Sequence, residues 1–290
     1  MSDLYIRSLS IDWNKIAPDS YLRKIPALQG LTHLEFHRNI TFLAGENGSG
    51  KSTLLEALAT AYGFNAEGGT LNYRFSTYDE LPELGDALRL VRGALPKPKA
   101  GYFFRAESFF NVATVTLREY NDDGSMPNYH AISHGESFME FISRYHQKGI
   151  YLMDEPEAAL SPQRHLSLLT HIVQMAETGS QFIIATHSPI LLGTPNAEIL
   201  EFGEHDIHSC EYEETESYQI TKLFIENREM LLHQLLDEKY GSPLRGAICY
   251  SSMTPIFTSA SWIPCSSNRP VCIFECCLAI SVALPIAMGK

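Results

Sequence analysis

The sequence predicts an α/β fold whose central sheet is largely parallel. One observation is a strand, a glycine-rich turn and a helix in succession over residues 40–62. Another is a pair of apolar strands, at 150–153 and 181–186, that flank an amphipathic helix. Because strands that alternate with helices build mostly parallel sheets, both observations point to the same fold class.

The N-terminal elements follow from apolar runs and from helical spacing. Residues 4–11 and 33–36 have strand composition, and the loop between them contains Pro18 and Pro26. After the strand at 40–44, a helix begins at Ser52 and is expected to end near Gly63. The apolar side chains on one face of this helix are Leu54, Leu55, Leu58, Ala61 and Tyr62.

The middle of the chain is less regular. Residues 66–100 are polar and rich in Gly and Pro, with one helix predicted around 84–91. Strands are expected at 101–104 and 112–117, followed by a turn at 121–124. The next helix, at about 136–147, carries Phe138, Phe141, Ile142 and Tyr145 at helical spacing.

A further helix lies between the strands at 150–153 and 181–186. It begins with Ser161 as its cap and Pro162 in its first turn. The apolar residues expected to face one way on this helix are Leu166, Leu169, Ile172 and Val173.

Composition narrows the class of protein. The 290 residues include 22 Lys and Arg against 34 Asp and Glu, a formal net charge of −12. This balance argues against a surface that attracts nucleic acid everywhere, although it leaves room for a local basic patch. Residues 1–5 have no basic region followed by an apolar stretch, so we expect no signal peptide and a cytoplasmic location. No cysteines show the paired C-x-x-C spacing of a zinc site.

The glycine-rich turn carries the strongest motif. Residues 45–52 read GENGSGKS, fit the pattern G-x-x-x-x-G-K-[ST], and stand between a strand and a helix, as a P-loop requires. The glycines let main-chain N–H groups point at a polyphosphate, and the helix N-terminus adds its dipole. We predict a P-loop NTPase in which Lys51 reaches the β- and γ-phosphates and Ser52 ligates Mg²⁺. The other predicted nucleotide contacts in this segment are Asn47, Gly48, Ser49, Gly50 and Thr53.

Two acids follow the apolar run 150–153. Asp154 and Glu155 therefore lie at the carboxyl edge of a buried strand, where ligands of open α/β sheets collect. Asp154 is the expected Mg²⁺ partner of Ser52, and Glu155 is predicted to polarise the water that attacks the γ-phosphate.

His187 follows the strand at 181–186 in the same way. A lone histidine is more often structural than catalytic. At the end of a strand beside the one that carries the acids, however, its ring can contact the γ-phosphate, and we predict that role.

The segment 133–137 reads SHGES and precedes an apolar helix. Ser and Glu at this spacing form a capping box, and a helix N-terminus with an exposed Ser and a Gly is also an anion site. Both interpretations are compatible.

The P-loop, this segment, the Asp-Glu strand and the His strand occur in that order, and the set resembles the ATP-binding-cassette (ABC) ATPases. It looks most like the soluble SMC-like and RecF-like branch, and more closely like small bacterial predicted ATPases of the AAA family. Residues 103–110 (FFRAESFF), 133–137 and 154–162 (DEPEAALSP) carry the resemblance, which covers roughly residues 1–240. It implies an ABC-ATPase-like head with a largely parallel core sheet, an antiparallel β subdomain and a helical signature region.

The resemblance also implies a partner and a shared site. Two copies would form a head-to-tail homodimer that sandwiches two ATP molecules with Mg²⁺. Each ATP would contact the P-loop of one copy and Ser133 and Gly135 of the other, with Glu136 in the same signature segment. Residues 159–161 would occupy the loop that crosses the dimer axis.

This chain departs from the family pattern in two places. The usual Gln that reads Mg²⁺ is replaced within residues 104–107, where Glu107 or Arg105 would have to substitute. In addition, the short interval between Ser52 and Ser133 leaves no room for the long coiled-coil arms of SMC proteins.

The last fifty residues, 241–290, differ in character. Glu275 is their only acid, Ser, Pro and Cys are abundant, and helical periodicity is absent. The apolar stretch 271–288 suggests a membrane segment, but Glu275, Pro285 and the cysteines weaken that interpretation. A non-homologous extension, a membrane anchor and a genuine appendage all stay open.

Three functions fit residues 1–240. The first is an ATPase that dimerises on ATP and serves DNA repair, genome maintenance or defence, with DNA or a protein as a further partner and no membrane expected. The second is the ATP-binding subunit of a transporter, disfavoured by the missing Gln and by the sequence EAAL at 157–160. The third is a nucleotide-gated switch with little turnover.

Overall fold

The computed structural model describes residues 4–71, 83–98, 100–106, 138–139, 142 and 147–240. Residues 1–222 form one compact unit, and a second unit begins at Leu223. The predicted strand at 112–117, the turn at 121–124 and the tail 241–290 lie outside the described residues.

A 7-stranded sheet forms the centre of the first unit, with the strand order β10-β9-β3-β8-β7-β6-β4. Strands β9, β3, β8, β7 and β6 run parallel, whereas β10 and β4 pair antiparallel at the two edges. The prediction of an α/β fold with a largely parallel sheet is therefore confirmed. The strands are β3 (Ile40–Gly45), β4 (Gly69–Thr70), β6 (Ala100–Arg105), β7 (Gly149–Asp154), β8 (Gln181–Ala185), β9 (Glu198–Phe202) and β10 (Ile207–Cys210).

A smaller antiparallel sheet has the order β2-β1-β5. It consists of β1 (Ile6–Ile11), β2 (His33–Glu35) and β5 (Leu88–Arg92). The buried Gln181, at the start of β8, connects it to the large sheet. Its amide oxygen accepts hydrogen bonds from the Tyr5 and Ile6 N–H groups at 2.9 Å each, and its amide nitrogen donates to the Ile6 carbonyl at 2.9 Å.

The predicted helix around 84–91 is wrong in its second half. Helix α2 (Glu83–Ala87) ends at Ala87, and the chain continues as strand β5. In β5, Leu90 pairs with Leu9 of β1 and Leu88 with Ile11. The edge of β1 offers a hydrogen-bonding partner along this whole segment, and that tertiary pairing overrides the local helix signal.

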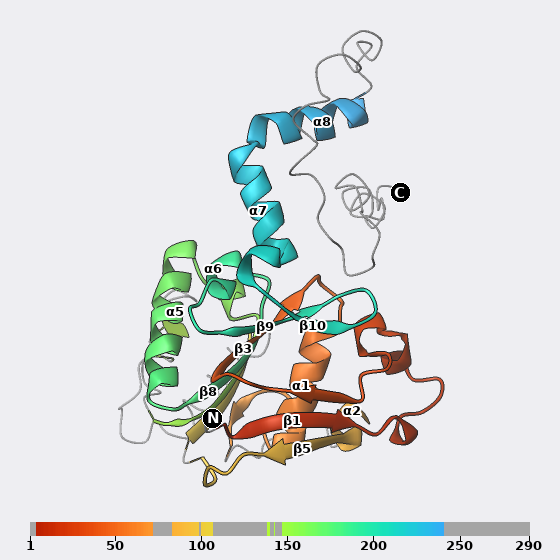
Figure 1. Cartoon of the computed structure of the whole chain (residues 1–290), viewed down its shortest axis with the longest axis vertical. Helices are drawn as coiled ribbons and strands as arrows, with labels where there is room; N and C mark the ends of the chain where they lie inside the picture. Colours follow the sequence, from red (N-terminus) through yellow and green to blue (C-terminus); the bar gives the residue numbers. More distant parts are fainter. Residues whose placement is uncertain are drawn as a thin grey trace, which may run out of the picture. The chain divides into compact units, whose positions relative to one another are not determined.

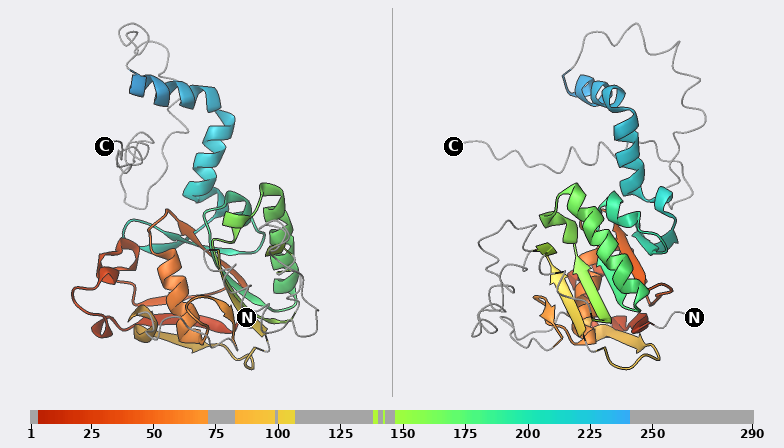
Figure 2. Two further views of the ribbon diagram at one scale, coloured as in Figure 1. Left: turned by 180° about the vertical axis from the view of Figure 1, so that it is seen from behind. Right: turned by 90° about the vertical axis from the view of Figure 1, so that its left-hand side faces the viewer.

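Helices cover both faces of the large sheet (Figures 1 and 2). On one face lies α1 (Lys51–Tyr62), which packs against β7 and β8 and also against α2 and β5. It ends as predicted, because Gly63 takes a left-handed conformation and donates its N–H to the carbonyls of Ala59 and Thr60. On the other face lies α5 (Pro162–Glu177).

The core strands divide their side chains between these faces with a period of two residues. In β7, Ile150 and Leu152 belong to the core on the α1 side, whereas Tyr151 and Met153 belong to the core on the α5 side. Strand β8 alternates in the same way. A strand buried on both faces reads as a continuous apolar run, which is why these strands were recognisable from the sequence.

Helix α5 corrects two predicted details. Ser161 occupies the N-cap position, but its side chain makes no capping hydrogen bond. The buried stripe runs through Leu168, Ile172 and Met175, while Leu166 is 56% exposed. Residues 168, 172 and 175 follow the i, i+4, i+7 spacing of one helix face, and Leu166 falls outside it.

The remaining described helices are short or lie near the boundary of the second unit. In the predicted helix at 136–147, Phe138 and Ile142 are helical and buried among the described positions. Across the described ranges, no helix is long and apolar enough to cross a membrane. The other helices are α6 (Pro189–Leu192), α7 (Glu216–Glu226), α8 (Arg228–Tyr240) and the 3₁₀ turns Trp13–Lys15, Tyr21–Lys24, Pro26–Leu28, Pro156–Ala159 and Tyr212–Glu214.

Gly45, at the end of β3, is a position where we expect substitution to destabilise the fold. Its φ is +128°, and a Cβ added there would lie 2.8 Å from the main-chain oxygen of Phe202 on β9. Gly45→Ala is therefore expected to lower the free energy of unfolding by about 3 kcal/mol, the upper range for a strained backbone position. Urea denaturation measures this loss.

Gly63→Ala provides the matched control. Gly63 has a φ of +113°, but an added Cβ would meet nothing within 4 Å. Gly63→Ala keeps a positive φ but creates no steric clash, so it should lower the free energy of unfolding by only about 1 kcal/mol. Equal losses in the two variants would contradict the role assigned to the close approach of β9.

Candidate functional site

The phosphate loop connects β3 to α1. The chain leaves β3 at Gly45, and Gly50 takes a left-handed φ of +102° at the N-cap position of α1. A Cβ on Gly50 would lie 2.7 Å from Cγ2 of Ile25, so the loop closes against the segment that follows β1. Asn47 and Gly48 are exposed on the loop, and Thr53 lies half-buried in the first turn of α1.

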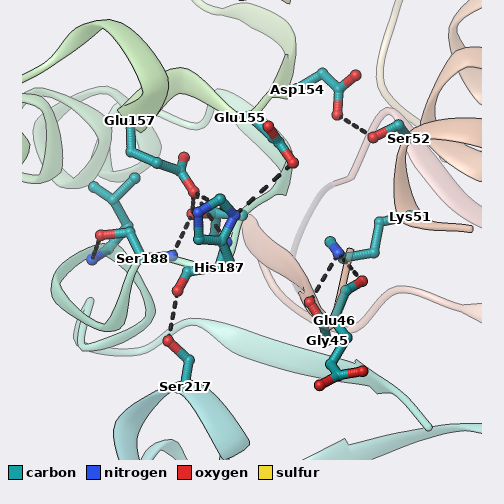
Figure 3. A network of polar contacts seen from close by, with 12 residues as sticks. Gly45, Glu46, Lys51, Ser52, Asp154, Glu155, Glu157, His187, Ser188 and Ser217 are labelled. Atoms are coloured by element: carbon teal, nitrogen blue, oxygen red, sulfur yellow. Dashed lines mark hydrogen bonds and ion pairs between the residues drawn. The ribbon is translucent and has the colours of Figure 1, made fainter. Parts of the chain in front are cut away.

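Lys51 is the first residue of α1, and its side chain is buried at 3% exposure. Its ammonium donates to the Gly45 carbonyl at 2.8 Å and to the Glu46 carbonyl at 2.6 Å (Figure 3). Burial lowers the pKa of Lys51, and the carboxylates of Glu155 and Asp154 oppose that shift. The ammonium thus lies at the base of the loop, within a set of main-chain oxygen acceptors.

Ser49 has a hydroxyl that is buried without a hydrogen-bond partner in the described part of the chain. A buried hydroxyl that lacks a partner costs free energy, so its position within the loop indicates an acceptor or donor that a ligand supplies. Phosphate oxygens are acceptors of this kind.

Ser52 and Asp154 meet across the edge of the sheet. The Ser52 hydroxyl donates to Oδ1 of Asp154 at 2.8 Å, although the two residues come from α1 and from the end of β7 (Figure 3). Asp154 is buried, with 9% of its surface exposed. The two side chains predicted to share a metal ion are therefore adjacent.

Arg105 ends β6, directly opposite Asp154 in the parallel register. Its Nη1 lies 2.8 Å from Oε2 of Glu56 and 3.0 Å from the Ala66 carbonyl oxygen, and its Nε lies 3.9 Å from Oδ2 of Asp154. Arg105 thus connects α1 to the carboxylate that faces Ser52. Glu107, the other candidate for this position, lies outside the described residues, as do Ser133, Gly135 and Glu136.

Glu155 follows β7 in a left-handed conformation, with φ 47° and ψ 53°. Its N–H donates to the Ala185 carbonyl at 2.9 Å, and its own carbonyl accepts from the Ala158 N–H at 3.1 Å. A non-glycine residue with positive φ persists only where its surroundings hold it, and such positions cluster at functional sites. The Glu155 side chain is 37% exposed, so water can reach it.

His187 lies two residues beyond β8, the strand between β3 and β7. Its ring is 49% exposed, and Nδ1 lies 3.8 Å from Oε1 of Glu155. Figure 3 shows the ring beside both Glu155 and Glu157. The carbonyl of His187 accepts a hydrogen bond from the Ser217 hydroxyl at the start of α7.

Sequence reasoning assigned no role to Glu157, which the structure places within this group. It lies in the 3₁₀ turn Pro156–Ala159, and its carboxylate accepts hydrogen bonds from Thr186 and His187. The sequence signal for Glu157 is that it is the third acid in the segment 154–157, which follows a buried apolar run. Such a cluster is equally typical of a solvated loop.

Two half-buried acids, one on β9 and one at the start of α7, interact electrostatically with residues of the loop. Burial raises the pKa of Glu201, at β9, and also the pKa of Glu216, at the start of α7. The charge of Glu46 contributes further to the shift in Glu216. Among residues 45–52, Lys51 is the one basic side chain that the loop can offer to an anionic ligand.

Two protein-family models match the chain. One, described as "AAA domain, putative AbiEii toxin, Type IV TA system", matches residues 71–193. The other, described as "AAA domain", matches residues 21–81. No curated protein matches the chain.

Several solved structures are similar to the chain at low identity. The SMC head domain from Thermotoga maritima is 13% identical, with 72% of this chain and 100% of that chain covered and a TM-score of 0.41. A nucleotide-free ATP-binding cassette from an ABC transporter is 13% identical, with 79% and 99% covered and a TM-score of 0.42. MJ1267, an ATP-binding cassette of an ABC transporter, is 18% identical, with 79% of this chain and 97% of that chain covered and a TM-score of 0.39. At these values the likeness carries no conclusion about activity.

The two family models divide the site between them. The first residues of the site, 45–52, fall in the range 21–81, and Asp154, Glu155 and His187 fall in the range 71–193. AAA-domain family models therefore match the chain on both sides of the site, over residues 21–193.

Proposed function

We propose that this protein binds ATP with Mg²⁺ at the edge of the sheet formed by the ends of β3, β7 and β8, and hydrolyses it. The observation that carries the proposal is the 2.8 Å hydrogen bond between the Ser52 hydroxyl and Oδ1 of Asp154. It joins the last residue of the phosphate loop to the carboxylate at the end of β7, which is the pair that a P-loop enzyme uses to hold its metal.

The donor atoms available at this position suit Mg²⁺. A hydroxyl and a carboxylate are hard oxygen ligands, and Mg²⁺ in nucleotide enzymes takes one or two protein oxygens with phosphates and water completing the set. Ser52 and Asp154 would hold the ion, which when bound neutralises charge on the β- and γ-phosphates. Over the described ranges, no group of three or more His, Cys, Asp or Glu side chains forms a separate metal site.

Each residue around the loop has a task that follows from its position. Lys51 donates to phosphate oxygens in place of the carbonyls of Gly45 and Glu46, with which its ammonium is now bonded. The buried Ser49 hydroxyl gains a phosphate partner. Glu155 accepts a proton from the attacking water, and His187 contacts the γ-phosphate from the end of β8.

The complete site is proposed to need a second copy of the chain. Ser133, Gly135 and Glu136 of the second copy would contact the same ATP, and Glu107 would supply a further oxygen near the metal. One matched family is described as a putative toxin of a toxin–antitoxin system. This description favours defence or genome maintenance as the process that ATP turnover serves.

The experiment that tests this function is steady-state phosphate release from ATP by the full chain. It is carried out with Mg²⁺ or with excess EDTA, and with or without linear duplex DNA. We expect release that requires Mg²⁺. Stimulation by DNA would place the protein in repair or genome defence, whereas turnover that ignores DNA would direct the search to a protein partner.

Two other outcomes separate the alternatives. Tight ATP binding without phosphate release would identify a nucleotide-gated switch and overturn the proposed hydrolysis. Recovery of the protein with a membrane permease would favour the transporter subunit.

A further inference from the structure

Glu157 is a buried carboxylate with only one of its oxygens compensated. Its side chain is 6% exposed. Oε1 accepts hydrogen bonds from the Thr186 hydroxyl at 2.6 Å and from the His187 N–H at 2.9 Å. Oε2 is buried and has no hydrogen-bond partner among the residues that the structure describes. A buried carboxylate with an uncompensated oxygen costs stability that a well-packed apolar side chain would not, so its presence calls for a functional reason.

The groups that Glu157 contacts lie at the end of β8, on the edge of the sheet where we propose that ATP binds. Besides the His187 N–H, the same Oε1 lies 3.5 Å from Nδ1 of the His187 ring (Figure 3). The hydroxyl of Thr186 donates to Glu157 and accepts from the Ser188 N–H at 3.0 Å. The carboxylate therefore fixes both the main chain and the ring at the end of β8.

The main chain of Glu157 belongs to the turn that holds Glu155. The two residues are separated by Pro156 alone, and the Ala158 N–H closes the turn on the Glu155 carbonyl at 3.1 Å. The Glu157 carbonyl accepts from the Leu160 N–H at 2.9 Å, within the loop 159–161 predicted to cross the dimer axis. One residue thus connects the turn after β7 to the end of β8.

We propose that Glu157 is a positioning residue that sets His187 relative to Glu155, an inference that rests on the proposed ATPase function. It does not contact the nucleotide. It acts through His187, because its carboxylate holds the histidine main chain and attracts the ring while its own main chain shapes the turn behind Glu155.

The chain offers a matched control at the opposite end of the sheet. Glu198, the first residue of β9, has a side chain that is 9% exposed. It accepts from the His37 N–H at 3.0 Å and from the Thr41 hydroxyl at 3.3 Å, and it lies 2.7 Å from Nδ1 of His37. The donors are of the same three kinds as at Glu157, but none belongs to the proposed site.

The test measures kcat and KM for ATP with the full chain and its Glu157→Ala, Glu157→Gln and Glu198→Ala variants. Misplacing a catalytic group by about 1 Å costs about 100-fold in rate, so Glu157→Ala should lower kcat by about that factor with KM changed less than about threefold. Glu157→Gln keeps an oxygen acceptor for Thr186 and His187 and should retain an intermediate kcat. Glu198→Ala should leave kcat within about twofold of wild type, since the partners of Glu198 lie away from the proposed ATP site.

A double substitution decides whether Glu157 acts through the histidine. If it does, the Glu157→Ala/His187→Ala protein should be no slower than His187→Ala alone, because residues that act as a unit lose activity non-additively. Additive losses, a rise in KM with kcat retained, or an equal kcat loss in Glu198→Ala would overturn the proposal.

A second readout does not depend on turnover. Hydrogen exchange of the His187 amide in nucleotide-free protein should be faster in Glu157→Ala than in wild type and unchanged in Glu198→Ala. Unaltered exchange in Glu157→Ala would overturn the positioning role. Absence of ATP hydrolysis by the wild type, in contrast, would count against the proposed function alone.

Discussion

Replacing Glu155 with glutamine is expected to lower kcat for ATP hydrolysis by about 10³-fold while leaving ATP affinity within about threefold of wild type, in the range that general bases contribute. Glutamine keeps the size of the side chain but cannot accept a proton from the attacking water. The Glu155 side chain is 37% exposed, so losing its charge leaves no buried charge without a partner. Phosphate release and equilibrium binding of a fluorescent ATP analogue measure the two quantities.

Glu177→Gln is the control for that variant. Glu177 is an exposed acid at the end of α5, and its replacement makes the same chemical change away from the site. We expect unchanged kinetics. A kcat for Glu155→Gln within about threefold of wild type would exclude Glu155 as the general base, because such bases contribute at least about 100-fold.

The Glu155→Gln variant also tests the proposed dimer. With ATP and Mg²⁺, Glu155→Gln should accumulate as a dimer in gel filtration, because binding closes the shared site and hydrolysis no longer opens it. A protein that binds ATP and elutes only as a monomer would contradict the ATP-sandwiched dimer and leave the assignment of the base intact.

Lys51→Met should weaken ATP binding by about 100-fold or more, since removing one partner of a buried charge pair costs about 2–5 kcal/mol. Methionine is an unbranched side chain that can occupy the buried space, where Lys51 is 3% exposed. It leaves the phosphates without the ammonium and the carbonyls of Gly45 and Glu46 without their donor. Titration with a fluorescent ATP analogue measures the affinity, and urea denaturation confirms that the variant folds.

Lys15→Met is the matched control. Lys15 also donates its ammonium to a main-chain carbonyl, that of Asp86 at 2.9 Å, but it lies in an exposed turn after β1. Affinity for ATP should not change in this variant. Binding by Lys51→Met within about threefold of wild type would remove Lys51 from the phosphate site, because loss of a buried charge contact costs far more.

Much of the site follows from local sequence patterns. The motif at 45–52 predicted the turn between β3 and α1, and the apolar runs before Asp154 and His187 predicted two strands that end at the same edge. These inferences succeed because a strand buried on both faces and an amphipathic helix leave periodic signals within a few residues.

The errors and omissions have a different origin. Strand β5 was predicted as part of a helix. It forms a strand because it pairs with β1, about eighty positions away in the sequence, and local patterns do not show that pairing. The buried face of α5 was shifted toward Leu166, since local periodicity does not say which neighbouring stripe meets the sheet. In both cases the partner that decides the outcome lies outside the local window.

The sequence by itself determined the fold class, the glycine-rich loop between β3 and α1, and the residues at the carboxyl ends of β7 and β8. Only the tertiary structure decided that β8 lies between β3 and β7, that Arg105 lies between Glu56 and Asp154, and that Glu157 holds Thr186 and His187. The physical reason is that strand order and register join side chains thirty to one hundred positions apart, and no local periodicity encodes those contacts.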